Sequence, residues 1–158
     1  MPTILKSSNG WRASKYAAVI GVKSYPIPGT SIKIRLAKKA APLLVGLATE
    51  FHKTIEPIDK GTLDDWGYAF RMIRGSTDSL SNHSSGTAID LNATKHPLGK
   101  ENTFSPENAA KCIALAKKYG CKWGGTYRNR KDDMHFEIAL NRKQTKELIG
   151  KLGLVKDE

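Results

Sequence analysis

Residues Ala88–Asn92 (AIDLN) alternate apolar and polar side chains, as a strand with one buried face does. The two apolar side chains within this stretch share one face, and Asp90 takes the other. A second stretch, Met134–Ile138 (MHFEI), repeats the pattern and places His135 and Glu137 opposite its apolar residues. Each strand is therefore expected to anchor itself in the core by one face and to present metal-capable side chains on the other.

The remaining periodicities predict an α+β fold, with helices flanking a small, mostly antiparallel sheet. No repeat or long linker divides the 158 residues, so we expect a single domain over residues 1–158 with no separate wall-binding domain. Its first 34 or so residues are expected to be irregular. The predicted helices are Arg35–Ile55, Pro106–Tyr119 and Lys143–Leu152, and the predicted strands are Tyr68–Ile73, Thr87–Asn92, Lys122–Gly124 and Met134–Leu140.

Two of these helices carry boundary signals. In the first, apolar residues recur at steps of three and four, but Pro42 requires either a start near Lys39 or a kink. The helix after Ser105 is better defined, because Ser105 can cap it and Gly120 can close it. Its apolar stripe places Cys112 in the core, as expected for a reduced thiol.

The charge of the chain is its least ordinary compositional property. Lys and Arg number 26 against 15 Asp and Glu, a net charge of +11. Such a charge attracts polyanions such as nucleic acid, anionic lipid or an anionic bacterial wall. The sequence has no recognisable nucleic-acid-binding motif and no apolar run long enough to span a membrane. Residues 1–10 contain no apolar stretch typical of a secretory signal peptide, so we expect synthesis in a cytoplasm.

A third metal-capable residue, His83, lies in the polar segment that leads into the Asp90 strand. Two imidazoles and one carboxylate, from His83, Asp90 and His135, would bind zinc and leave one tetrahedral position open, as in catalytic sites. The same donor set suits a non-haem iron oxygenase, but the seven-residue spacing of the first two ligands argues against that class. His52 and His96 are expected to be ordinary surface or hydrogen-bonded residues.

These residues stand in motifs of a known family. Ser81–Asp90 (SNHSSGTAID) matches the SxHxxGxAxD signature of the zinc D-alanyl-D-alanine carboxypeptidase family, and Asp132–Glu137 (DDMHFE) resembles its second signature. The WGG at Trp123–Gly125 also resembles the sequence that commonly precedes the second signature of this family. Residues 30–138 resemble the peptidase domain of bacteriophage endolysins in this family. The resemblance implies the hedgehog-like zinc D,D-peptidase fold.

The resemblance also implies roles for individual residues. His83, Asp90 and His135 would hold one zinc ion per chain. Asp132 would be the general base that takes a proton from the attacking water and passes it to the leaving amine. Strand alternation instead favours Asp133 as the general base, so the choice between the two acids stays open. Whichever of them is not the base would be an orienting group.

Further roles follow from the same resemblance. Arg71 would stabilise the scissile carbonyl oxygen as it becomes an oxyanion. Arg74 is the competing candidate for this role, or would instead bind a carboxylate of the substrate. Ser81 would bind substrate or orient a ligand, unless it only caps a turn. Gly86 is expected to allow a close backbone approach, and Glu137 to accept a hydrogen bond from a ligand histidine.

The substrate implied is the stem peptide of bacterial peptidoglycan. We expect a monomeric phage endolysin that cuts L-alanyl–D-glutamate bonds, made in the host cytoplasm, released to the wall and attracted to its anionic surface without binding nucleic acid. The alternatives are a D-alanyl-D-alanine carboxypeptidase or dipeptidase, and a non-catalytic zinc-containing module that binds the wall.

Overall fold

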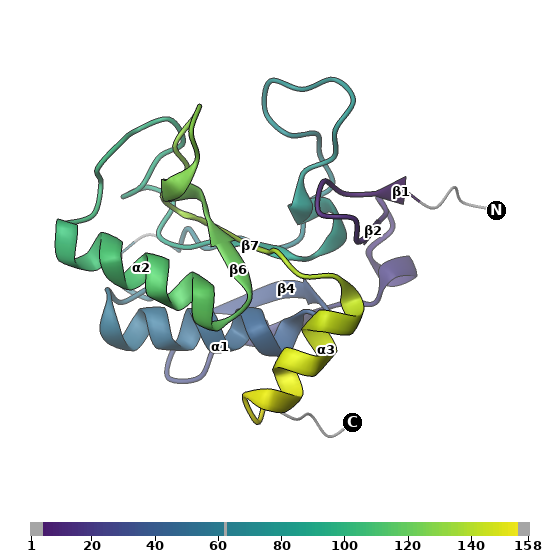
Figure 1. The fold of residues 1–158 in the computed structure, drawn as a ribbon, viewed down its shortest axis with the longest axis horizontal. Coiled ribbons are helices and arrows are strands. Elements are labelled where there is room, and N and C mark those ends of the chain that lie inside the picture. The colour runs from purple at the N-terminus through teal and green to yellow at the C-terminus, as the bar shows by residue number, and fades with distance from the viewer. Residues whose placement is uncertain (1–4, 62, 155–158) are drawn as a thin grey trace.

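A three-stranded antiparallel sheet, in the order β5-β7-β6, forms the centre of the fold (Figure 1). The computed structural model describes residues 5–61 and 63–154. Two antiparallel strand pairs and three α-helices surround the sheet, which confirms the α+β prediction. The strands are β1 (Leu5–Lys6), β2 (Arg12–Ala13), β3 (Val22–Pro26), β4 (Lys33–Ala37), β5 (Ala88–Asp90), β6 (Cys121–Trp123) and β7 (His135–Ile138), and the helices are α1 (Ala41–Thr54), α2 (Pro106–Lys118) and α3 (Arg142–Lys151).

The core lies between one face of this sheet and helices α1 and α2. Phe136 of β7 and Phe51 of α1 are both fully buried, and their rings meet edge to face with centroids 6.1 Å apart. Ile89 and Ile138 lie in the same buried cluster. Burying one face of β5 and β7 against the helices leaves Asp90, His135 and Glu137 on the other face, as the alternation predicted.

Helix α2 begins and ends where its boundary signals indicated. The Ser105 hydroxyl accepts a hydrogen bond from the Asn108 amide at 3.1 Å, and Gly120 takes a left-handed backbone conformation after the last turn. Cys112 is fully buried, and both Cys112 and Cys121 are free thiols.

The N-terminal third is more regular than predicted. Residues 33–37 form strand β4, which pairs with β3 over five residues, so the predicted helix start at Arg35 is wrong and the alternative start near Lys39 is closer. The prediction was wrong because Leu36 reaches the core from a strand and matches the helical spacing only by coincidence. Helix α1 starts at Ala41, with Pro42 in its first turn. Residues 1–4 and 155–158 of the predicted single domain lie outside the described residues.

The predicted strand over 68–73 is absent from the described structure. The backbone donors of this segment go to separate partners: Tyr68 donates to the Arg35 carbonyl, Ala69 to the His83 carbonyl and Arg71 to the Ser84 hydroxyl. A continuous ladder needs one neighbouring strand, so only isolated bridges form, Trp66 with Asp90 and Met72 with Leu80. None of the described helices has the length and apolar character needed to cross a bilayer.

Candidate active site

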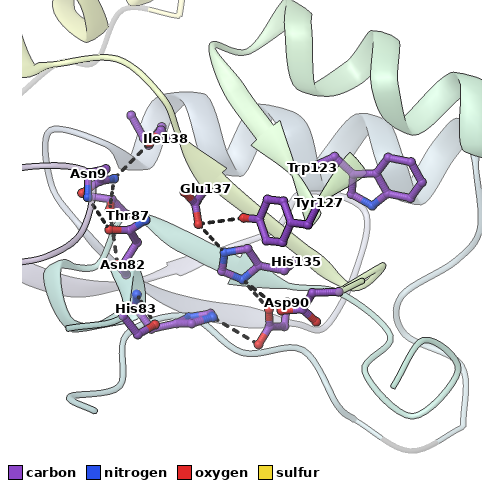
Figure 2. A network of polar contacts seen from close by, with 12 residues as sticks. Asn9, Asn82, His83, Thr87, Asp90, Trp123, Tyr127, His135, Glu137 and Ile138 are labelled. Atoms are coloured by element: carbon purple, nitrogen blue, oxygen red, sulfur yellow. Dashed lines mark hydrogen bonds and ion pairs between the residues drawn. The ribbon is translucent and has the colours of Figure 1, made fainter. Parts of the chain in front are cut away.

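The polar face of the central sheet brings His83, Asp90 and His135 together, with one ligand atom of each residue within 4.8 Å of the others (Figure 2). The strand register accounts for two of them, because Asp90 of β5 lies directly opposite His135 of β7. His83 comes from a short 3₁₀ turn, residues 82–85, which precedes β5. All three residues are at least 93% buried.

Hydrogen bonds orient both imidazoles toward the point between the three residues. His83 Nδ1 lies 2.7 Å from the Gly67 carbonyl oxygen, so this nitrogen donates and Nε2 keeps its lone pair. His83 Nε2 lies 3.2 Å from Asp90 Oδ2, yet it forms no hydrogen bond with any described residue. A buried, unpaired nitrogen facing a carboxylate is what a metal ligand presents before the ion is bound.

His135 is oriented in the same way from its other side. Its Nε2 lies 2.7 Å from Glu137 Oε1, and its Nδ1 lies 3.0 Å from Asp90 Oδ1. Burial lowers the pKa of His135, but the hydrogen bonds to the two carboxylates outweigh it and raise the pKa to about 10. The facing imidazoles hold the pKa of Asp90 below its usual range, against the effect of burial. The site therefore stabilises positive charge, and two nitrogens with one carboxylate fit a zinc ion with an open position.

Asp132 and Asp133 point to different places. Asp132 lines the cleft above the three residues, and its Oδ2 lies 4.0 Å from His135 Nδ1. Its buried Oδ1 finds no hydrogen-bond partner among the described residues, and burial raises its pKa to about 6. The buried Asp133 carboxylate instead accepts hydrogen bonds from the amide and hydroxyl of Thr103, the latter at 2.6 Å. Of these two acids, Asp132 is therefore the one placed to exchange a proton in the cleft.

Gly124, in the WGG sequence, lets the chain bring Asp132 to this position. The Gly124 carbonyl accepts a hydrogen bond from the Asp132 amide at 3.1 Å. A Cβ at Gly124 would lie 2.2 Å from the Asp132 carbonyl oxygen and 2.9 Å from its Cβ, closer than any real contact. Only glycine permits this backbone approach.

Gly124→Ala is therefore expected to displace Asp132 and to reduce peptide hydrolysis by about 10²-fold, because misplacement by about 1 Å can have that effect. Metal content should be unchanged. Gly150→Ala is the matched control, since a Cβ there meets nothing within 4 Å, and a helical Gly→Ala change should stabilise by about 0.5–1 kcal/mol. Hydrolysis rates, metal content and thermal unfolding of both variants provide the comparison. Full activity in Gly124→Ala would contradict this role.

The site lies at the bottom of a cleft of about 580 Å³. Two loops, residues 71–80 and 124–131, project from the same side of the molecule in Figure 1 and contribute to its walls. Arg71 and Arg74 both line the cleft, as do Ser81 and Glu137. The Arg71 backbone is held beside His83, because its amide donates to the Ser84 hydroxyl, which donates in turn to the Arg71 carbonyl. Arg74 lies beyond the pairing of Ile73 with Ser79, in the exposed turn of the same loop.

Three further predictions concerned residues that support the site. The Ser81 hydroxyl accepts a hydrogen bond from the His83 amide and so caps the 3₁₀ turn, while the residue also lines the cleft. Gly86 has a φ of +70°, and a Cβ there would lie 2.6 Å from the Ala37 nitrogen, which confirms the close approach. Glu137 accepts the hydrogen bond from His135.

The other two histidines are hydrogen-bonded, as expected. The His52 ring accepts from the Ile58 amide. His96 is buried rather than exposed, with its two ring nitrogens on Glu56 and Thr103 and its ring stacked on Phe104.

Sequence reasoning missed the residues that hold Glu137 in place. The Tyr127 hydroxyl donates to Glu137 Oε1 at 3.0 Å (Figure 2). Hydrogen bonds from His135, Asn82 and Tyr127 lower the pKa of Glu137 although burial opposes this. The backbone N–H of Asn9 donates to Asn82 Oδ1 at 2.8 Å, which leaves the side-chain amino group of Asn82 to donate to Glu137. No local pattern signals these contacts, and the hydrogen bond between Asn9 and Asn82 joins residues that are 73 positions apart.

Comparison with known proteins supports one relationship. A family model described as D-alanyl-D-alanine carboxypeptidase matches residues 74–138, a segment that holds all three candidate metal ligands and Asp132. The match covers less than half of the chain and supports a peptidase of this family. Neither the curated proteins nor the solved structures gave a match to the chain.

Proposed function

We propose that the chain is a zinc-dependent peptidase that hydrolyses peptide bonds in the stem peptides of bacterial peptidoglycan. The observation that carries the proposal is that His83, Asp90 and His135 form one metal-binding set, and that Asp90 and His135 of this set line the same cleft as Asp132 and Arg71. A non-catalytic metal site would need neither a buried, unpaired carboxylate at its mouth nor a cation held next to it. The match to the carboxypeptidase family model supports the same chemistry.

In this proposal, zinc held by His83, Asp90 and His135 supplies a Lewis acid for the attacking water and the scissile carbonyl. Asp132 takes a proton from that water at its carboxylate and later delivers it to the nitrogen of the leaving amine. Arg71 stabilises the negative charge that develops on the carbonyl oxygen. Glu137 keeps the proton of His135 on Nε2 and so leaves Nδ1 free to act as a ligand.

We favour a phage endolysin that cuts L-alanyl–D-glutamate bonds, acting as a monomer after its release from the host cytoplasm. The resemblance of residues 30–138 to endolysin peptidase domains supports this choice. A net charge of +11 supports attraction to a polyanion such as an anionic wall, and the absence of a recognisable nucleic-acid-binding motif in the sequence argues against nucleic acid as that polyanion. A D-alanyl-D-alanine carboxypeptidase or dipeptidase is the second candidate, since the matching family model bears that description.

Digestion of purified peptidoglycan, followed by mass spectrometry of the new termini, tests the proposal. The favoured reaction produces new N-terminal D-glutamate and C-terminal L-alanine, whereas the second candidate releases D-alanine. The Asp132→Asn variant controls for contaminating hydrolases. Wall binding without new termini in the zinc-loaded protein would point to the non-catalytic module and refute the proposal.

A further inference from the structure

A groove of about 820 Å³ lies between strand β3 and helix α1, and it shares none of its described lining residues with the active-site cleft. Helix α1 packs on the apolar face of the central sheet, whereas the cleft opens on the polar face. Figure 1 accordingly shows α1 on the opposite side of the central strands from the two loops of the cleft. The core therefore separates this groove from the candidate metal site.

The floor of the groove is apolar. Tyr25 of β3, Val45 of α1 and Leu154 pack against the core with one side and stay partly exposed to the groove with the other. Pro26 and Pro42 add further apolar surface. The outer face of a surface helix normally carries polar side chains, so this face of α1 is unusual. An apolar surface with a polar rim is typical of a binding site.

The acidic group of the groove is already paired within the protein. A Cβ at Gly46 would lie 2.7 Å from Cε1 of the Tyr119 ring, so glycine allows this ring to lie directly against α1. The Tyr119 hydroxyl donates to Glu50 Oε1 at 2.9 Å, and Lys118 Nζ lies 2.8 Å from the same oxygen. The hydrogen bond from Lys118 lowers the pKa of Glu50 although burial opposes this. Glu50 is the only carboxylate among the described lining residues.

Three exposed lysines, Lys23, Lys38 and Lys53, also line the groove. Within the part of the chain that the structure describes, none of their ammonium groups lies within 4.0 Å of a carboxylate oxygen. Lysine stems lie along apolar surface while their charged ends stay in water. An apolar floor is thus surrounded by three positive charges that no described acidic group neutralises.

This combination fits an amphiphile with an anionic head. Sites for such molecules measure about 300–1,000 Å³ and are mostly apolar, with a few polar groups that fix the orientation of the ligand. A phospholipid offers a phosphate to the lysines and an acyl chain to the floor. An anionic wall polymer would match the lysines but leave the apolar floor uncovered.

We propose that the groove binds an anionic phospholipid of a membrane surface, with one acyl chain along the apolar floor and the phosphate next to Lys23, Lys38 and Lys53. Lipid binding at this site does not depend on the proposed peptidase activity. Because the groove and the cleft lie on opposite sides of the central sheet, a chain bound in this way presents its cleft away from the membrane.

Co-sedimentation of the full chain with vesicles tests the site. Vesicles of phosphatidylglycerol and phosphatidylcholine in equal parts are compared with vesicles of phosphatidylcholine alone. The variant Lys23→Gln/Lys38→Gln/Lys53→Gln removes the rim charges, and Val45→Asn makes the floor polar without a change of charge. The matched control removes three charges from exposed positions that line neither the groove nor the cleft: Lys95→Gln/Lys143→Gln/Lys146→Gln.

The full chain should bind the anionic vesicles and not the neutral ones. Loss of the rim lysines should weaken binding by about 10²-fold, because each lysine at an anionic surface contributes about fivefold. Val45→Asn should weaken it by about tenfold through lost apolar burial, and the matched control by less than about fivefold. Glycerol phosphate, which is the head group without acyl chains, should not release the protein. Thermal unfolding and hydrolysis of a soluble stem peptide should be the same in all variants, since none of the changed residues lines the cleft.

Several results would overturn the lipid site and leave the peptidase proposal intact. Equal losses in the rim and control variants would assign binding to net charge. Full affinity in Val45→Asn, or release by glycerol phosphate, would exclude an acyl chain on the floor. Binding to purified cell walls without binding to vesicles would assign the groove to an anionic wall polymer. Vesicle binding found only in Asp157→Asn/Glu158→Gln would assign the groove to the acidic residues that follow Leu154.

Discussion

Asp132→Asn is expected to reduce turnover by about 10²–10⁴-fold, the usual contribution of a positioned general base. The substitution is nearly isosteric and changes none of the three candidate metal ligands, so metal content and thermal unfolding should stay close to those of the unmodified protein. The loss should appear in kcat, because the carboxylate acts on the proton of the attacking water. Steady-state hydrolysis of a stem peptide, with metal analysis of the same samples, measures it.

Asp133→Asn is the matched control for this experiment. Its carboxylate accepts two hydrogen bonds from Thr103 and lies outside the cleft, so we expect turnover to change by less than about tenfold. Its stability should fall, because an amide group next to those donors leaves part of a buried network unsatisfied. Loss of activity in Asp133→Asn with an active Asp132→Asn would reverse the assignment. Full activity in both would refute the hydrolase mechanism.

His83→Ala is expected to reduce bound zinc from one ion per chain to near zero, and peptide hydrolysis to background. The variant removes one of only three ligands, and the remaining pair holds zinc weakly at neutral pH. Metal content after reconstitution and dialysis, with the rate of hydrolysis, provides the test. His52→Ala is the control, because the His52 ring accepts a hydrogen bond from Ile58 and takes no part in the cleft. Stoichiometric zinc in His83→Ala would exclude the proposed metal site.

Local patterns were sufficient to predict the two strands at the centre of the site. In β5 and β7 the side chains alternate between two faces, so burial of Ile89 and Phe136 by itself turns Asp90 and His135 to the opposite face. Helix α2 was equally predictable, since Ser105 and Gly120 act on their own turns of the chain. These signals involve residues within a few positions of one another and do not depend on the rest of the fold.

Patterns of the same kind failed where distant segments compete for the backbone. The apolar spacing from Leu36 onward predicted that the helix already includes Leu36. Residues 33–37 instead pair with β3 over five residues and form strand β4. The segment 68–73 had the composition of a strand, yet its amides donate to separate partners, at Arg35, at Ser79 and in the 3₁₀ turn of residues 82–85. Propensity is weak compared with such pairing, so the tertiary structure decided both cases.

The sequence by itself thus determined the donor set of the candidate metal site, because the order and spacing of His83, Asp90 and His135 are written in two local motifs. Only the tertiary structure decided which acid faces the cleft. Asp132 and Asp133 are neighbours, and the choice depends on Gly124 and Thr103, which reach them from 8 and 30 residues away. Contacts with such distant partners leave no periodic trace in a sequence, because they form only when folding brings the separate segments together.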